Sequence, residues 1–352
     1  MDINIMMIGG RRCGKTSVLA SMQDSFDKIF GKSNLTIETD AESMLPLSEK
    51  MDEIQNLYAL KDKVPRFTPD DNPTAEMTKY HLSISLKSKP KGKIDYHFID
   101  FPGEWVQSKE HSKDVEELVK SSDVFVVAID TPHLMEEAPD NTPESVGIYN
   151  DKQNRCKMIC EFLKKAPLEG NPKMVLFVPL KCEKYSIENK MELVNQRVKT
   201  AYRSFFDYID NDFNRHKCTI VIAPIFTFGT VQFTRFKREG SEILLHDNYQ
   251  LPKYPLYSFT DKATNRPEPK YCEQPLLYVL YYLLRAAQKE REDKTDGVFK
   301  KLFGKISERF FKMPSSGDFM KEIDTIQKEI KINGDGYEII SDPLGLKGSM
   351  IK

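Results

Sequence analysis

Eight residues near the start of the chain combine glycines, a lysine and a threonine at a spacing that suits phosphate binding. Residues 9–16 read GGRRCGKT and satisfy the pattern GxxxxGK[ST] in full. Glycines let the backbone curl so that its N–H groups face phosphate oxygens, and the positive end of a following helix attracts the same charge. Lys15 would reach the terminal phosphates, and the Thr16 hydroxyl would join the ligands of a Mg²⁺ ion. The residues expected to bind the phosphates are Gly9, Gly10, Arg11, Arg12, Cys13, Gly14, Lys15, Thr16 and Ser17.

A second motif, DFPG, follows a short apolar strand predicted over residues 95–99. The spacing D-x-x-G places Asp100 at the end of this strand and Gly103 in the turn that follows. Asp100 would hold the Mg²⁺ ion through a water molecule, and the Gly103 N–H would bond the γ-phosphate. D-x-x-G by itself is common, and the alternative is an ordinary turn after a strand. Its position favours the nucleotide-binding interpretation.

These motifs need a scaffold that brings the ends of several strands together. Apolar runs predict strands over residues 3–8, 80–86, 95–99, 124–129, 174–180 and 219–225. Helical spacing predicts helices from residue 15, over 40–62, 108–121, 150–165 and 186–210, and from Pro275 onwards. Strands that alternate with helices predict an α/β fold, with a doubly wound, mostly parallel sheet covered on both faces. Ligands bind at the carboxyl ends of such strands, where both motifs fall.

The composition is that of a globular protein. The chain has 352 residues, of which 39% are hydrophobic and 30% charged, so wholesale disorder is not expected. Its net charge of −1 does not favour nucleic acid as a partner. No apolar run is long enough to span a membrane, and the first residues lack a signal-peptide pattern. The six cysteines form no CxxC pair and the six histidines no metal-ligand spacing, so we expect a reduced, cytoplasmic protein.

The two motifs together resemble those of the small GTP-binding, Ras-like class of P-loop proteins. In that class a threonine before the second strand closes over Mg²⁺ and the γ-phosphate. The resemblance implies that Thr78 is this further metal ligand, because its separation from Asp100 is typical of the small GTPases. Thr68 and Thr74 lie in the same predicted loop and are the alternatives.

The resemblance also concerns the residues that would take part in hydrolysis. Where the class often has a water-positioning glutamine, this chain has Glu104. A carboxylate can orient water or accept its proton, but it also repels the γ-phosphate, so slow turnover is expected. Arg11 and Arg12 stand where the class often has small residues, and one of them would stabilise the transition state in cis, as an arginine finger does. The alternative is that both pair with surface carboxylates or stabilise the loop.

Base recognition in this class uses N-K-x-D after a buried strand, and residues 180–183 of this chain read LKCE. The resemblance implies that Lys181 lies along the base and that Glu183 accepts hydrogen bonds from N1 and N2 of guanine. Leucine replaces the asparagine and glutamate the aspartate, and the alternative is that the segment is merely a charged strand end. In the family, the loop after the next strand supplies backbone N–H groups to the base oxygen. Here Thr227 and Phe228 are the candidates.

The motifs DFPGEW, LKCEKY and PIFTFG together resemble the bacterial double-GTPase families, which are found in conflict and signalling gene clusters. The resemblance covers about residues 3–290. It implies a P-loop GTPase-like domain over residues 1–292, with inserts at about 30–75 and 228–272. Residues 293–352 would then form a C-terminal helical extension.

A basic amphipathic segment, GVFKKLFGKISERFFKM, occupies residues 297–313. Its apolar residues recur at helical spacing, with lysines and arginines around them. Such a helix would contact a membrane surface or a partner, or it would pack its apolar face on the domain. We favour packing on the domain.

The sequence as a whole favours a Mg²⁺-dependent GTPase that hydrolyses GTP slowly and acts as a switch. Its ligands would be GTP and GDP, and its partner an unidentified protein effector or regulator. Two alternatives are a nucleotide-binding scaffold with negligible hydrolysis, supported by Glu104, and an ATPase, supported by the departures at residues 180 and 183.

Overall fold

The computed structural model describes most of the chain. The described residues are 2–30, 34–59, 76–168, 173–211, 214, 216–247, 250–260, 267–292, 316–322 and 335–346. Thr68, Thr74 and the basic segment 297–313 lie outside them. Every helix within these ranges is too short or too polar to cross a lipid bilayer.

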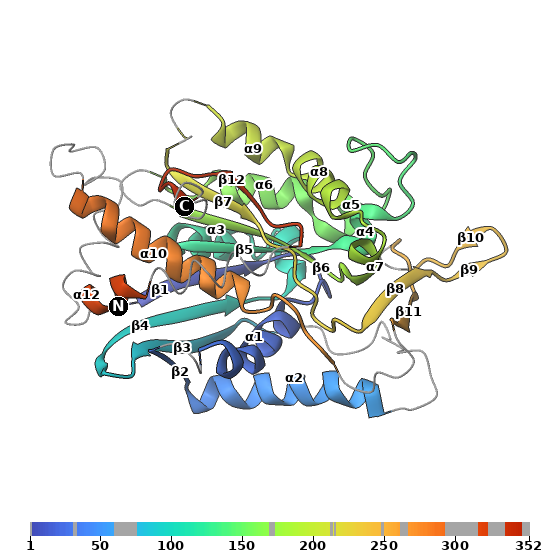
Figure 1. The fold of residues 1–352 in the computed structure, drawn as a ribbon. Coiled ribbons are helices and arrows are strands. Elements are labelled where there is room, and N and C mark those ends of the chain that lie inside the picture. Colours follow the sequence, from blue (N-terminus) through green and yellow to red (C-terminus); the bar gives the residue numbers. More distant parts are fainter. Residues whose placement is uncertain are drawn as a thin grey trace.

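A central sheet organises the described part of the chain, with the strand order β12-β7-β6-β5-β1-β4-β3-β2 (Figure 1). The parallel strands are β1 (Asp2–Ile8), β4 (Lys89–Asp100), β5 (Val124–Asp130), β6 (Lys173–Leu180) and β7 (Cys218–Ile222). The antiparallel strands at the two edges are β2 (Leu35–Thr39), β3 (Thr78–Leu86) and β12 (Glu338–Ser341). The doubly wound, mostly parallel sheet predicted from the sequence is therefore confirmed.

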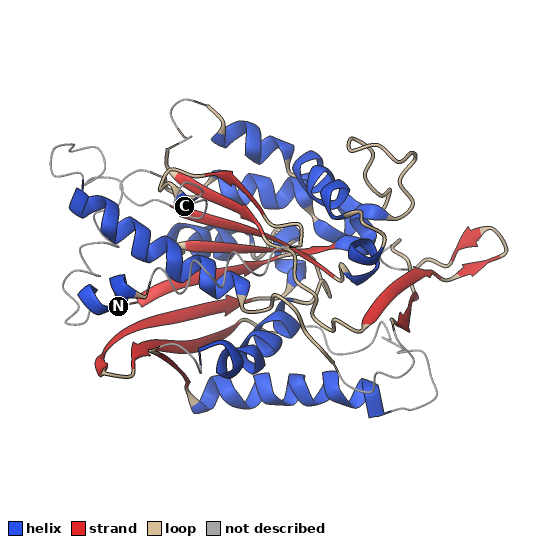
Figure 2. Cartoon of the chain, viewed as in Figure 1, coloured by secondary structure: helices blue, strands red, loops and turns tan. Residues whose placement is uncertain are grey.

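Helices cover both faces of this sheet (Figure 2). One face carries α1 (Lys15–Phe30), α2 (Ala41–Ala59), α10 (Gln274–Glu292) and α12 (Ser316–Lys321). The other face carries α3 (Ser112–Ser121), α6 (Cys156–Lys164), α8 (Met191–Ala201) and α9 (Arg203–Ile209). Short helical turns follow the strand ends, namely η1 (Gly103–Gln107), α4 (Thr131–Met135), α5 (Asn150–Asn154) and α7 (Glu183–Ile187).

Strand β1 shows how the sequence produces this layering. Ile3, Ile5 and Met7 belong to the core on the α1 face, whereas Met6 and Ile8 belong to the core on the α3 face. Because successive side chains of a strand point to opposite faces, a strand covered on both sides appears in the sequence as a continuous apolar run. The runs in β5 and β6 are buried along their whole length for the same reason.

The helix predicted over residues 186–210 is divided into α7, α8 and α9. Asn189 between α7 and α8 has a φ of 54°, a left-handed conformation that ends a helix. Tyr202, with φ −106° and ψ 19°, separates α8 from α9. Its buried ring packs against Phe177 of β6 with the ring centroids 4.9 Å apart, so the break lets an aromatic side chain enter the core.

A hairpin insertion, residues 231–259, follows β7 and extends past the carboxyl ends of the parallel strands (Figure 1, right). Its antiparallel pairs are β8 (Val231–Phe236) with β11 (Pro255–Phe259), and β9 (Arg238–Glu239) with β10 (Glu242–Ile243). The insert predicted at about 228–272 is therefore partly a β-structure with its own small apolar core.

The C-terminal segment 293–352, predicted as a helical extension, also contributes strand β12 to the sheet. This strand pairs antiparallel with β7. Lys199 Nζ lies 2.6 Å from Glu338 Oε1, and the Asn195 side-chain amide donates to the Gly336 carbonyl at 2.7 Å. Part of this segment is thus built into the core of the fold, because the free edge of β7 accepts a further strand.

Candidate nucleotide-binding site

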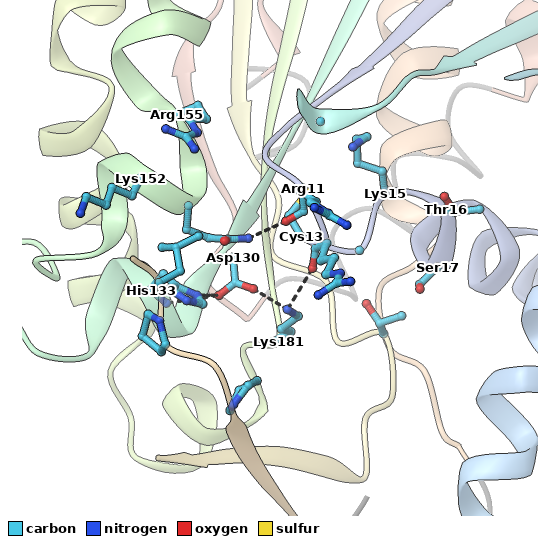
Figure 3. A pocket seen from close by; sticks show the side chains of 18 of the residues that line it. Arg11, Cys13, Lys15, Thr16, Ser17, Asp130, His133, Lys152, Arg155 and Lys181 are labelled. Carbon is cyan, nitrogen blue, oxygen red and sulfur yellow. Dashed lines mark hydrogen bonds and ion pairs between the residues drawn. The ribbon is translucent and has the colours of Figure 1, made fainter. Parts of the chain in front are cut away.

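A cavity of about 290 Å³ lies where the carboxyl ends of β1, β4, β5 and β6 meet (Figure 3). The sequence-predicted residues that line it are Arg11, Arg12, Cys13, Gly14, Lys15, Thr16, Ser17, Gly103, Glu104, Lys181, Thr227 and Phe228. The other predicted residues, all of them described, lie outside the lining, namely Gly9, Gly10, Thr78, Asp100 and Glu183.

The loop between β1 and α1 is packed too closely for a side chain at its second glycine. A Cβ at Gly10 would lie 1.8 Å from the carbonyl oxygen of Gln153 in α5. The Gln153 side-chain amide in turn donates to the Arg11 carbonyl at 2.7 Å. Arg12 and Gly14 have positive φ, 58° and 110°, which turns the backbone toward the start of α1. The loop is therefore shaped by its own glycines and by a helix that is distant in sequence.

The Thr16 hydroxyl and the Asp100 carboxylate, which are predicted to bind the metal, lie side by side. The Thr16 hydroxyl donates to Asp100 Oδ2 at 2.7 Å, and Lys15 Nζ lies 3.9 Å from Asp100 Oδ1. Asp100 is fully buried, and its Oδ1 accepts no hydrogen bond from the described residues. Burial raises the pKa of Asp100, although Lys15 and the hydrogen bond from the Thr16 hydroxyl both lower it. The arrangement leaves one buried carboxylate oxygen available to a ligand.

The D-x-x-G glycine touches the phosphate loop directly. A Cβ at Gly103 would lie 2.4 Å from the Arg11 nitrogen and 2.5 Å from the Gly10 carbonyl carbon, so only glycine fits. The next residue, Glu104, places Oε1 2.9 Å from Arg11 Nε. Two of the side chains predicted to act in hydrolysis are therefore paired with each other. The third, Arg12, lines the cavity.

Thr78 is the first residue of β3, in register with Asp100 of β4. It is half-buried, and strand pairing rather than a mobile loop determines its position. The role as a metal ligand that the resemblance implies for it stays a prediction.

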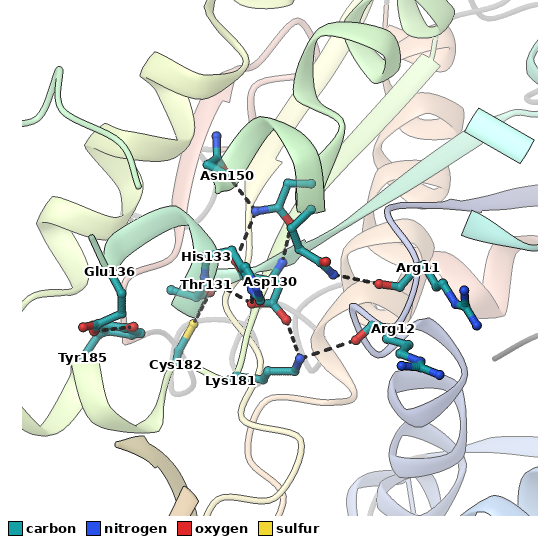
Figure 4. A network of polar contacts seen from close by, with 12 residues as sticks. Arg11, Arg12, Asp130, Thr131, His133, Glu136, Asn150, Lys181, Cys182 and Tyr185 are labelled. Atoms are coloured by element: carbon teal, nitrogen blue, oxygen red, sulfur yellow. Dashed lines mark hydrogen bonds and ion pairs between the residues drawn. The ribbon is translucent and has the colours of Figure 1, made fainter. Parts of the chain in front are cut away.

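Lys181 belongs to a polar network centred on Asp130 (Figure 4). Its ammonium group pairs with the Asp130 carboxylate and lies 3.4 Å from the Arg12 carbonyl. His133 Nδ1 lies 2.6 Å from the other Asp130 oxygen. Burial opposes ionisation, yet Lys181 and His133 bring the pKa of Asp130 below its usual value. Burial lowers the pKa of Lys181, Asp130 raises it, and the net change is upward.

Glu183 occupies the predicted element but is not among the residues that line the cavity. It begins α7, is buried, and accepts a hydrogen bond from the Gly229 N–H at 3.0 Å. Burial raises its pKa to about 7, against the effect of backbone hydrogen bonds and of Lys181. Its contact places the turn after Thr227 and Phe228, which do line the cavity.

Some residues of the site were missed by the sequence analysis. Asp130 ends the apolar run of β5 just as Asp100 ends β4, and this similarity could have indicated Asp130 as a residue of the site. The Asn154 side chain accepts from the Asp130 N–H at 2.7 Å and donates to the Asp130 carbonyl at 3.1 Å. No periodicity indicates such a contact, because α5 is a single short turn.

Arg155, also missed, adds a cation to the cavity wall (Figure 3). Its backbone is left-handed, with φ 53°, between α5 and α6. The side chain is half-buried, and its guanidinium forms no hydrogen bond with the described residues. Burial lowers the pKa of Arg155, which Asp151 opposes. A desolvated cation at a strained position suits an anionic ligand.

No curated protein matches this chain. Among solved structures, the GTPase-like domain of S. cerevisiae Ski7 bound to GTP is 14% identical, covering 72% of this chain and 48% of that chain at a TM-score of 0.37. The same domain bound to GDP and inorganic phosphate is 13% identical, covering 64% and 43% at a TM-score of 0.32. The match thus spans about half the length of these structures, and it is too weak to identify corresponding site residues.

The family comparison is more informative. The model of the Double-GTPase 2 family matches residues 3–219, which is more than half of the chain and includes the phosphate loop, D-x-x-G and the LKCE segment. The resemblance inferred from the motifs is confirmed. The chain belongs to the Double-GTPase 2 family of P-loop GTPases.

Proposed function

We propose that this chain is a Mg²⁺-dependent GTP-binding protein that hydrolyses GTP slowly and acts as a molecular switch, in bacterial conflict or signalling. One observation carries the proposal. The phosphate loop, the end of β4 and the D-x-x-G glycine meet at a single cavity, with Lys15 and Gly103 in its wall. This is the constellation that phosphoryl transfer requires.

The metal would be held by Thr16 and Asp100. Hydroxyl and carboxylate oxygens are the ligands that Mg²⁺ prefers, and Asp100 Oδ1 accepts no hydrogen bond from the described residues, so the donors present fit the ion. The bound ion would neutralise charge on the β- and γ-phosphate oxygens. Thr78, next to Asp100 in the strand register, is the candidate for the further ligand.

Slow hydrolysis follows from the pairing of Arg11 with Glu104. While its guanidinium faces Glu104, Arg11 is not directed at a phosphate, and the carboxylate adds negative charge beside the γ-phosphate position. The same pair supports a switch, because an arriving γ-phosphate competes with Glu104 for Arg11. Replacing Arg11 or Arg12 with alanine should slow hydrolysis more than it weakens binding. Unchanged turnover in both variants would exclude the cis arginine.

Calorimetry with GTP, GDP, ATP and ADP in the presence of Mg²⁺ tests the ligand. We expect the guanine nucleotides to bind more tightly than the adenine nucleotides, because Lys181 and Glu183 lie in the element that reads guanine in the Ras-like class. Tighter binding of ATP than of GTP would favour an ATPase.

A second candidate function is a nucleotide-binding scaffold with negligible hydrolysis, and the Arg11–Glu104 pair is the observation that favours it. Single-turnover phosphate release separates the two. Slow but measurable release that depends on Lys15 supports the switch, and release no faster than from free GTP supports the scaffold.

The proposed location is the cytoplasm, and a protein effector or regulator is the proposed partner. The six cysteines, all of them within the described residues, are free and buried, which suits a reducing compartment.

A further inference from the structure

The cavity has a chemical polarity. Its end at the phosphate loop is cationic and polar, with Arg12, Lys15 and Thr16. The wall contributed by the hairpin insertion and the loop before it has more apolar character, since it contains Phe228, Leu251, Pro252, Pro255 and Tyr257 beside the polar residues Thr227, His246 and Lys253. A nucleotide has the same polarity, with an anionic chain at one end and a flat aromatic base at the other.

The hairpin insertion is docked on the elements that follow β5 and β6. The Phe236 ring lies 4.9 Å, centroid to centroid, from the His133 ring of α4. From α7, Lys184 Nζ lies 5.4 Å from the centre of the Phe233 ring and donates to the Thr234 carbonyl at 3.4 Å. A salt bridge of 2.5 Å joins Arg238 to Glu137. These contacts fix the position of the hairpin relative to α4 and α7. Asp130 and Lys181 stand just before these two helices.

Tyr257 links the hairpin to the site itself. It is buried with 7% exposure, and its ring meets Phe233 edge-on at 5.9 Å. Lys181 lines the same cavity. Lys181 itself contacts the phosphate loop and the end of β5, so Tyr257 brings the insertion to a cavity that those two parts also line. Glu183, by contrast, lies outside the lining of the cavity.

We propose that the hairpin insertion is part of the nucleotide site, with Tyr257 as the residue whose ring packs against the purine base. The inference rests on the proposed function, and it names which part of the nucleotide the insertion contacts. Phe228 and the two prolines add apolar surface to the same wall. The insertion then contributes to affinity for the nucleoside, while the phosphate loop contributes to affinity for the phosphates.

The test is calorimetry on the full chain with GTP, GDP and inorganic tripolyphosphate as probes. Tyr257→Ala should weaken GTP and GDP about tenfold, which lies within the range that stacking of a base on an aromatic ring contributes. Tripolyphosphate, which has no base, should bind the variant as it binds the wild type. Tyr257→Phe keeps the ring, so its loss of affinity for GTP and GDP should be less than half of the loss in Tyr257→Ala on a logarithmic scale. Tyr254→Ala is the matched control, because Tyr254 belongs to the same hairpin but not to the cavity lining.

Two results would overturn the inference while leaving the proposed function intact. One is GTP affinity in Tyr257→Ala equal to that of the wild type and of Tyr254→Ala. The other is equal weakening of GTP and tripolyphosphate, which would mean that Tyr257 supports the fold of the site rather than the base. Absence of GTP and GDP binding by the wild type would instead overturn the proposed function itself.

Discussion

The two ends of the cavity are built in different ways. At the phosphate end, short motifs supply both the backbone and the side chains. The loop after β1 carries Lys15 and Thr16, and the end of β4 with the turn after it carries Asp100 and Gly103. At the opposite end, Lys181 is held by Asp130 and by the Arg12 carbonyl, and Tyr257 lines the same cavity, so three distant segments meet there. The first end depends on local geometry that a motif encodes. The second depends on tertiary packing.

The largest effect is expected at the phosphate end. Lys15 is buried beside Asp100, and Lys15→Ala should lower affinity for GTP and for tripolyphosphate alike, by about a thousandfold, because several charge-assisted hydrogen bonds are lost together. Calorimetry measures both. Lys157→Ala, at a side chain 85% exposed, is the control. Retained affinity for either probe would break the comparison.

The Asp130–Lys181 pair should matter most for stability at the opposite end. Asp130→Asn removes the counter-charge of a lysine that is largely buried, so the free energy of unfolding should fall by about 3 kcal/mol. Urea denaturation gives the value, with the exposed Asp114→Asn as control. If the two variants unfold alike, the network around Lys181 does not stabilise the fold.

Glu183 should give the same end a pH dependence. Burial raises its pKa from an ordinary value of 4.5 to about 7. Between these values the folded state keeps a proton that the unfolded chain has released, so stability falls as pH rises, by at most about 1.4 kcal/mol per pH unit. Glu183→Gln should flatten this part of the profile, which urea midpoints at about pH 5 and pH 8 would show. A slope equal to that of the wild type would contradict the assignment.

The smallest effect is expected at Arg155, on the cavity wall beside the phosphate loop. Its guanidinium lines the cavity, where a phosphate would pair with it, so Arg155→Ala should weaken GTP by about tenfold and leave the fold intact. Binding is followed by calorimetry and stability by thermal unfolding. Arg203→Ala, at a side chain 79% exposed, controls for loss of charge. Unchanged GTP affinity would confine phosphate recognition to the motifs.

The same contrast explains what the sequence could predict. Strand β1, the loop after it and Asp100 were predictable, because an apolar run followed by a contiguous motif determines both position and chemistry. The element that carries Lys181 was predictable too. The orientation of Glu183 was not, because it depends on the turn at Gly229, which lies far away in the sequence.

Residues that act through tertiary contact left little trace in the sequence. Gln153 lies in a helix of five residues, and Arg155 has a left-handed backbone just after it. Neither segment is long enough to show a periodic pattern. Tyr257 lies in an irregular hairpin with a register shift between Leu256 and Tyr257, so its pairing cannot be deduced from alternation. Asp130 is the exception, as the acid that ends a buried run.

Strand β12 has a practical consequence for shortened forms of the protein. It covers the outer side of β7 through pairing of Glu338, Ile339 and Ser341. A chain that stopped before Glu338 would present the unpaired N–H and C=O groups of β7 to solvent, and such an edge recruits strands from other molecules. Truncation at residue 292 would therefore favour self-association, however well the nucleotide site itself were preserved.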